Sequence, residues 1–283
     1  MGDILKIDNI IKDKKVPVIY PSTTIYDALH KMNQWDLRRL PVVDAGSNRI
    51  EGILTAMDIV DFMGGGSKYN LVKLKHDRNL YSAINEPVKE IMTPNPICIK
   101  EGSDLSDVLD LFINNNVGGL PVVDKDNRFI TTITERDVLR YLIDEIDKNI
   151  TIENYMTTEP ITATLGERLK DVARTMLRNG FRRLPIVSEG KLVGMITSTD
   201  FIKLLGSDWA FNHLKTGNVR EITNVRMEEI GTKDAITLKV NTSLYDGVSI
   251  MISNGIGALP VVDDSNHLIG IITEKDAIKY FYE

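Results

Sequence analysis

Apolar and polar positions along the chain follow the same order four times. Each copy has apolar residues at helical spacing, a Leu-Pro step with an apolar pair, a short polar turn, and a second apolar run ending in Thr-x-x-Asp. In the first copy Ile25, Ala28, Leu29 and Met32 recur at i, i+3, i+4 and i+7, the period of a helix with one buried face. The distance from Pro to the final Asp is 17, 16, 15 and 16 residues in the four copies. The chain is therefore predicted to contain one structural unit repeated four times.

Each copy predicts a strand, a helix, two strands and a second helix. An extended segment precedes the first helix, as in VPVIY at 16–20 and PITAT at 160–164, and a short helical segment follows each Thr-x-x-Asp. The polar turn between the two central strands predicts that they pair antiparallel. One unit of about 50 residues buries too little surface to be stable alone, so we expect the copies to pair.

Shared residues indicate that the duplicated module is a pair of copies. Copies one and three both have Arg-Arg-Leu-Pro, whereas copies two and four have small residues at that place and share Ile-Thr-Glu-Arg/Lys-Asp. We therefore predict two halves. The first is 1–148, with motifs at about 16–63 and 91–143, and the second is 149–283, with motifs at about 155–205 and 230–281.

Composition and charge narrow the class of protein. The chain has 283 residues, a formal net charge of −6 and one cysteine, Cys98, so it cannot form an intramolecular disulfide. An acidic chain is not expected to bind nucleic acid nonspecifically. No apolar run reaches the ~18 residues of a membrane span, and the charged N-terminal sequence lacks a signal-peptide core. We expect a cytoplasmic protein with no membrane partner.

The Leu-Pro-Val-Val-Asp strand and the Thr-x-x-Asp step resemble the cystathionine beta-synthase (CBS) motif. Two such motifs form a Bateman module. Four in one chain resemble the gamma regulatory subunit of AMP-activated protein kinase and its archaeal relatives. The resemblance implies an α/β fold in which four β-α-β-β-α motifs form two tandem Bateman modules packed into a disc, with ligand clefts between paired motifs.

The Thr-x-x-Asp steps have a structural and a binding interpretation. Thr at an N-cap with an acid three residues later is typical of a capping box, worth ~1 kcal/mol. A capping box favours the longer Glu or Gln, yet all four copies have Asp, which suggests a second use. By resemblance to the family, this Asp holds the two hydroxyls of a ribose. The candidate ribose-binding residues are Asp58, Asp137, Asp200, Asp276, Thr55, Thr134, Thr197 and Thr273.

The paired arginines also have two interpretations. They follow a helix, whose C-terminus attracts cations, but they also directly precede a strand whose alternation should turn one of each pair toward the ligand side. A guanidinium matches phosphate oxygens, and the resemblance implies phosphate contacts here. The chain departs from the kinase subunit in having Gly118-Gly119 and Gly257-Ala258 at the corresponding positions of copies two and four. The candidate phosphate-binding residues are Arg38, Arg39, Arg182, Arg183, Arg136, Lys275 and Thr199.

No catalytic or metal site is predicted. The four histidines lack ligand spacing, and GGGSK at 64–68 does not match a Walker A loop and is interpreted as a flexible connection whose Lys68 could reach a ligand. We expect a non-enzymatic sensor, without a cofactor, in which AMP, ADP and ATP compete for the clefts. A module for S-adenosylmethionine or methylthioadenosine, and a scaffold that binds no ligand, are the alternatives. A homodimer and a separate protein partner are compatible with this function.

Overall fold

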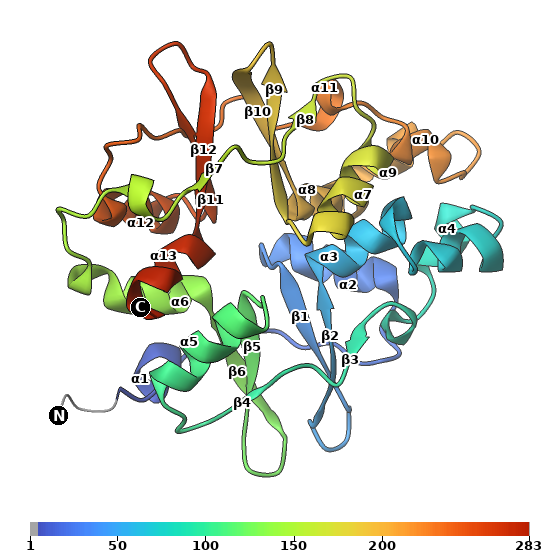
Figure 1. The fold of residues 1–283 in the computed structure, drawn as a ribbon. Coiled ribbons are helices and arrows are strands. Elements are labelled where there is room, and N and C mark those ends of the chain that lie inside the picture. Colours follow the sequence, from blue (N-terminus) through green and yellow to red (C-terminus); the bar gives the residue numbers. More distant parts are fainter. Residues whose placement is uncertain (1–4, 283) are drawn as a thin grey trace.

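The four sequence copies form four similar α/β units around a common centre (Figure 1). The structure is a computed structural model that describes residues 5–282. In each unit a helix precedes a β-hairpin, and a second helix follows it. Copy one consists of α2 (Ile25–Gln34), β1 (Arg39–Val43), β2 (Ile50–Thr55) and α3 (Ala56–Val60), and copy two of α5 (Leu105–Asn114), β5 (Gly119–Val123), β6 (Phe129–Thr134) and α6 (Glu135–Leu142). Copy three consists of α7 (Leu169–Asn179), β9 (Arg183–Ser188), β10 (Lys191–Thr197) and α8 (Ser198–Leu205). Copy four consists of α12 (Leu244–Ser253), β11 (Ala258–Val262), β12 (Leu268–Thr273) and α13 (Glu274–Tyr282).

Short helices lie before the first unit and in the connections between the units. They are α1 (Asp8–Ile11), the π-helical turns η1 (Asp61–Gly65) and η2 (Leu71–Lys75), α4 (Leu80–Ile84), α9 (Asp208–His213), α10 (Arg220–Thr223), α11 (Met227–Ile230), and the 3₁₀ turns η3 (Val88–Glu90), η4 (Ile143–Glu145) and η5 (Ile152–Asn154). Within the described part of the chain, every helix is too short or too polar to cross a membrane.

Four three-stranded sheets are built from the four hairpins, each with one added short strand. As predicted, the two hairpin strands of each copy pair antiparallel. The parallel additions are β4 (Ile99–Lys100) on β5 and β8 (Ala163–Thr164) on β9. The antiparallel additions are β3 (Thr93–Pro94) on β2 and β7 (Thr157–Thr158) on β12. The connection before copy two thus extends the sheet of copy one, and the connection before copy three extends that of copy four.

Two large apolar cores join the units through their helices. One core combines the buried faces of copies one and three and contains both Phe62 and Phe201. The other combines copies two and four, with Phe112 and Ile278 fully buried. Each such large side chain contributes about 1.5–3 kcal/mol by leaving water. The amphipathic helices therefore pack mainly against their counterparts two copies away along the chain.

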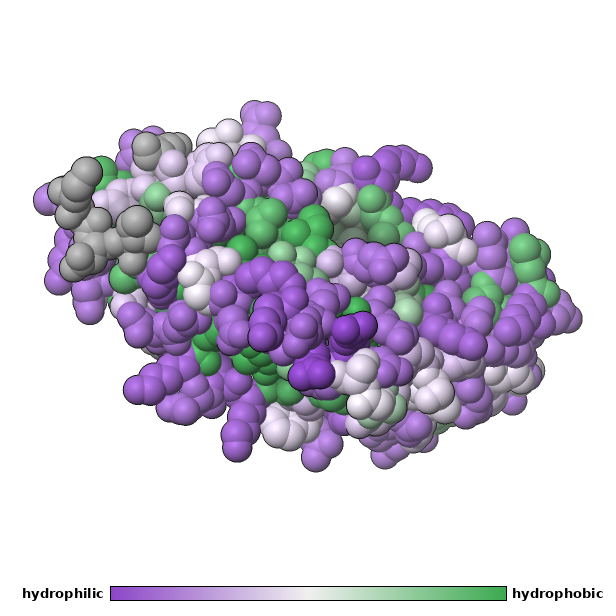
Figure 2. Space-filling view, turned by 90° about the horizontal axis from the view of Figure 1, so that it is seen from below, coloured by the Kyte–Doolittle hydropathy of each residue, from purple (hydrophilic) through white to green (hydrophobic). Residues whose placement is uncertain are grey.

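The hairpins make the contacts between neighbouring copies. Val43 and Ile50 of copy one cluster with Val123 and Phe129 of copy two. Met195, Ala258 and Ile271 form the corresponding cluster between copies three and four. Helix contacts in one direction and hairpin contacts in the other close the four units into a ring. Seen along the perpendicular direction of Figure 2, the molecule is flatter than in Figure 1. The face shown in Figure 2 is largely hydrophilic, with apolar residues between the polar ones.

Candidate functional site

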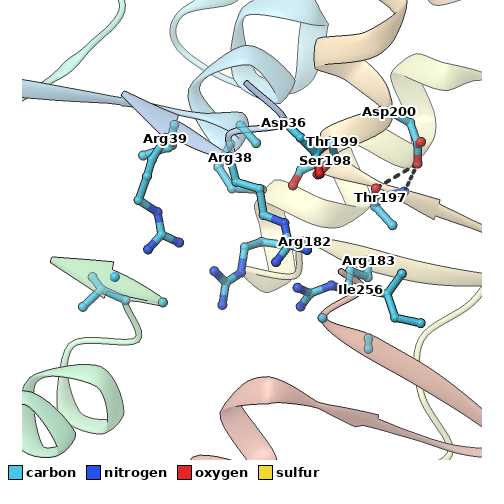
Figure 3. Close-up of a pocket in the computed structure, with 18 of the residues that line it drawn as sticks. Asp36, Arg38, Arg39, Arg182, Arg183, Thr197, Ser198, Thr199, Asp200 and Ile256 are labelled. Carbon is cyan, nitrogen blue, oxygen red and sulfur yellow. Dashed lines mark hydrogen bonds between the residues drawn. The ribbon is translucent and has the colours of Figure 1, made fainter. Parts of the chain in front are cut away.

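A cavity of about 820 Å³ lies where the four units meet. Its volume is within the range typical of small-molecule sites. It is lined by the start of β1 and β9, the first turns of α3 and α8, the turns before β5 and β11, and the connections before copies two and four (Figure 3). The turn before the first hairpin strand therefore contributes to this cavity in all four copies, whereas the helix first turns come only from copies one and three.

Four arginines line this cavity. Arg38 and Arg39 enter it from copy one, and Arg182 and Arg183 from copy three (Figure 3). A fifth guanidinium, that of Arg136, lies next to them: its Nε donates a 2.6 Å hydrogen bond to Glu274 Oε1, and the same carboxylate pairs with Arg38. Both arginines of each pair thus point inward, where the sequence predicted at least one.

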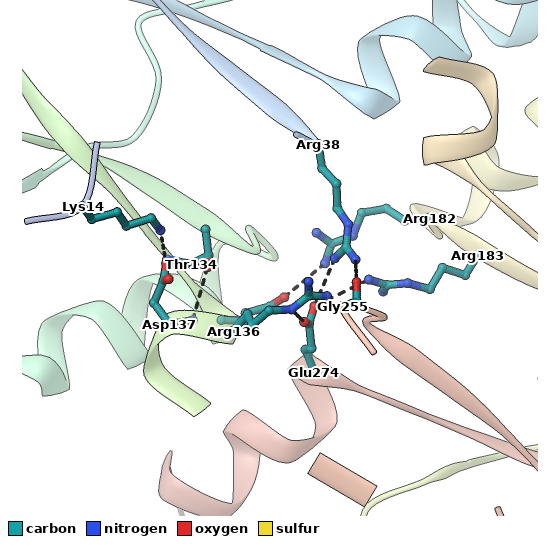
Figure 4. Close-up of polar contacts among 10 residues, drawn as sticks. Lys14, Arg38, Thr134, Arg136, Asp137, Arg182, Arg183, Gly255 and Glu274 are labelled. Carbon is teal, nitrogen blue, oxygen red and sulfur yellow. Dashed lines mark hydrogen bonds and ion pairs between the residues drawn. The ribbon is translucent and has the colours of Figure 1, made fainter. Parts of the chain in front are cut away.

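Two buried glutamates face these arginines. Glu274 lies 3.2 Å from Arg38 and 3.7 Å from Arg183, in addition to its bond with Arg136 (Figure 4). Glu135 lies 3.7 Å from Arg182. Only 2% of Glu135 and 3% of Glu274 is exposed to solvent. Buried ions require compensation, so these ion pairs hold Arg38, Arg136, Arg182 and Arg183 in place.

The cluster has more positive than negative charge. Five guanidiniums against two carboxylates leave a formal excess of three positive charges. Among the described residues 5–282, three buried atoms of this cluster have no hydrogen-bond partner: the acceptor Glu135 Oε1 and the donors Arg39 Nη1 and Arg136 Nη2. A buried donor without an acceptor is costly, and a bound anion would supply the missing acceptor.

The pKa values of the cluster reflect burial and mutual repulsion. Burial, with repulsion from neighbouring arginines, lowers the pKa of Arg39 to about 10 and that of Arg183 to about 9. Burial raises the pKa of Glu135. Burial also opposes ionisation of Glu274, but Arg38, Arg183 and Arg136 outweigh it and its pKa is lowered. The charged arginines are therefore destabilised in this site until an anion approaches.

The small residues of copies two and four make room for the arginines of copies one and three. A Cβ atom added at Gly119 would lie 1.4 Å from Arg39 Nη1, and one at Gly257 would lie 2.2 Å from Arg183 Nη2. The absence of basic residues at these two positions is therefore a packing requirement. The arginine pairs at the centre come from copies one and three instead.

The four Thr-x-x-Asp steps form the predicted helix caps. In copies one, two and three, Thr55, Thr134 and Thr197 are N-caps in reciprocal capping boxes with the Asp. In copy four, Thr273 N donates to Asp276 Oδ2 at 3.0 Å and Asp276 N donates back to Thr273 Oγ1 at 3.3 Å. The expectation that reaching back needs a longer side chain was wrong. The extended backbone of the N-cap brings its N–H close enough for Asp.

The four aspartates differ in what else they contact. Lys68 pairs with Asp58, Lys14 with Asp137 and Lys279 with Asp276. Asp200 makes no ion pair with any described residue, although Lys203 lies near enough to act on its pKa. Burial nevertheless raises the pKa of Asp200. Of the four carboxylates, that of Asp200 lines the central cavity, together with Thr197 and Thr199.

Most of the remaining candidates lie outside the cavity. Thr55 lines it, whereas the following do not: Asp58, Asp137, Asp276, Thr134 and Thr273. Lys275 also lies outside it, where its Nζ donates to Asn116 Oδ1 at 2.8 Å.

Sequence reasoning missed Glu135 and Glu274. Their signal was the Glu shared by Ile-Thr-Glu-Arg/Lys-Asp in the copies that lack arginine pairs. It also missed Lys14, whose contact with Asp137 spans 123 positions and follows no motif.

Comparison with known proteins agrees with the four-unit architecture. The CBS-domain family model matches residues 7–65, 88–144, 152–207 and 227–283. The chain belongs to the CBS-domain family. It is 61% identical over 277 residues to the uncharacterized protein MJ1225 of Methanocaldococcus jannaschii, with 98% of this chain and 99% of that protein covered. With four such motifs over most of its length, it is a regulatory CBS-domain protein.

Solved structures show the same fold. The crystal structure of MJ1225, which is described there as a proposed archaeal homologue of g-AMPK, superposes with a TM-score of 0.95 over 98% of this chain and all of that one. A conserved protein from Pyrococcus horikoshii, 21% identical, has a TM-score of 0.59 over 98% of this chain and 99% of that one. A 33.4 kDa protein of Thermofilum pendens is 28% identical over 261 residues, with 92% of this chain and 86% of that protein covered.

Proposed function

We propose that the protein is a regulatory sensor of adenine nucleotides, in which AMP, ADP and ATP compete for the central cavity. The observation that carries this proposal is the arginine–glutamate cluster, with its formal excess of three positive charges, at one end of a cavity that also contains the free carboxylate edge of Asp200. The rest of the lining adds Lys203 and the carboxylates of Asp36 and Asp234, so the positive excess is local to the arginine end. Cationic donors at one end and an acceptor at the other match a ligand with phosphate and a sugar diol. This chain is similar to MJ1225, which is described as a proposed homologue of g-AMPK, and this likeness supports adenine nucleotides as the ligands.

The side of the cavity formed by copies three and four fits a whole nucleotide. Met195, Ile236 and Pro260 supply apolar walls suited to a flat base. Asp200 Oδ2 accepts hydrogen bonds from Thr197 N at 2.6 Å and Thr197 Oγ1 at 2.9 Å, which orients the carboxylate and leaves Oδ1 available for two hydroxyls. The phosphates then extend toward the central guanidiniums, whose planar donors suit phosphate oxygens.

A ligand comparison tests this function. We expect AMP, ADP and ATP to raise the melting temperature of the full chain, because a ligand bound to the folded state stabilises it by mass action. S-adenosylmethionine at the same concentration should act weakly, since it has no phosphate for the arginines. A shift with S-adenosylmethionine alone would indicate the alternative ligand class, and no shift with any of these compounds would indicate a scaffold.

The raised pKa of Asp200 gives a pH prediction. The ionised carboxylate accepts hydrogen bonds from the diol, so AMP affinity should be highest above this raised pKa and should fall as the pH drops through it. The AMP phosphate also gains a proton near pH 6, so Asp200→Asn serves as the reference. Binding isotherms should show a steeper acid loss for the natural chain than for Asp200→Asn. Parallel profiles would exclude a role for this carboxylate.

A further inference from the structure

The GGGSK segment does not behave as a free linker. Asp61 Oδ1 accepts a 2.7 Å hydrogen bond from the backbone N–H of Lys68. A Cβ atom at Gly66 would lie 2.9 Å from the same oxygen, so the loop can approach Asp61 this closely because residue 66 is glycine. This anchoring directs the Lys68 side chain back onto α3, where Nζ contacts Asp58 Oδ1.

The contact with Lys68 completes the hydrogen bonding of Asp58. Its Oδ2 accepts from Thr55 N at 2.6 Å and from Thr55 Oγ1 at 2.7 Å. Its Oδ1 accepts from Lys68 Nζ and from Thr93 Oγ1 at 3.2 Å. A carboxylate has about four acceptor positions, and all four are in use. Asp58 is also 5% exposed, so no acceptor remains for an incoming hydroxyl.

Copy three lacks this arrangement. Asp200 accepts the same two bonds from its N-cap threonine, but its Oδ1 accepts none from the described residues. Three positions after the aspartate, copy one has Asp61, which holds the loop, whereas copy three has Lys203. The connection after copy three reads GSDWAFN and forms α9 instead of returning a lysine to α8. Equivalent motifs are thus made unequal by one loop.

We propose that Lys68 is an internal competitor that closes the sugar-binding position of copy one, so that the copy-three side of the cavity fills first. This inference rests on the proposed nucleotide function and deepens it by giving the order of filling. A nucleotide diol can reach Asp58 only after displacing the amine. Asp58 lies just behind Thr55, Ala56 and Met57 of the cavity wall, so Lys68 sets the difference in affinity between the sugar-binding positions of copies one and three.

The test is calorimetric titration of the full chain with AMP. The natural chain should bind one AMP tightly and a second one more weakly. In Lys68→Met the affinity of the second binding event should rise about tenfold, because one charge-assisted competitor is lost. Lys73→Met is the matched control, since Lys73 is an exposed lysine in η2, and it should behave like the natural chain. Asp61→Ala, which removes the loop anchor but keeps the lysine, should act in the same direction as Lys68→Met.

Site assignment uses Asp200→Asn. This variant should lose the tight event, and the double variant Lys68→Met/Asp200→Asn should keep one binding event at copy one. Two equal sites in the natural chain, or a Lys68→Met titration that matches the natural chain, would overturn the role of Lys68 while leaving nucleotide binding intact. Absence of AMP binding in every variant would instead refute the nucleotide function on which the inference rests.

Discussion

Glu274→Gln should lower the free energy of unfolding of the ligand-free protein by about 3–5 kcal/mol, the range for breaking a buried ion pair by removing one partner. The substitution keeps the shape of the side chain but removes the charge that faces Arg38, Arg136 and Arg183. Since Glu274 is 3% exposed, water cannot replace the lost carboxylate. Denaturant unfolding followed by circular dichroism measures the change.

The control for this prediction is Glu228→Gln, because Glu228 is an exposed acid 4.0 Å from Arg226 and should contribute little. A saturating anion should restore part of the stability lost in Glu274→Gln, since phosphate can compensate the same guanidiniums. Equal stability of the two variants would show that the arginines do not depend on Glu274 as their counter-ion.

The repeated unit could be predicted from local sequence because its determinants are close in the chain. The Leu-Pro step, the polar turn and the Thr-x-x-Asp cap act within about twenty residues, and each corresponds to a hairpin or a helix start in the structure. Helical periodicity likewise identified the buried positions of α2, such as Leu29 and Met32. Local signals of this kind do not specify which copy packs against which.

The central cluster could be predicted only in part. The arginine pairs were evident, but their counter-ions lie far away in the chain: Arg38 and Glu274 are 236 positions apart. The glycines of copies two and four looked like missing phosphate ligands, and their function as space for opposing guanidiniums is visible only in three dimensions. Similarly, four identical Thr-x-x-Asp steps gave no sign that Lys14 and Lys68 would engage two of them.

Arg183→Ala should weaken AMP binding about a hundredfold, as expected for losing charge-assisted hydrogen bonds from one buried guanidinium. The same variant should be at least as stable as the natural chain without ligand. Burial and the neighbouring Arg38 and Arg182 lower the pKa of Arg183 to about 9, so its charge at pH 7 opposes folding. Glu274 still has Arg38 and Arg136 after the substitution.

These opposite signs separate a binding residue from a structural one. Calorimetry measures the affinity, and thermal unfolding without ligand measures the stability. Arg174→Ala is the matched control, because Arg174 is an exposed arginine of α7 paired with Asp171, and it should change neither quantity appreciably. Loss of affinity with loss of stability would assign Arg183 to the fold. Loss of affinity with unchanged or higher stability would show that Arg183 binds the anion and does not stabilise the ligand-free protein.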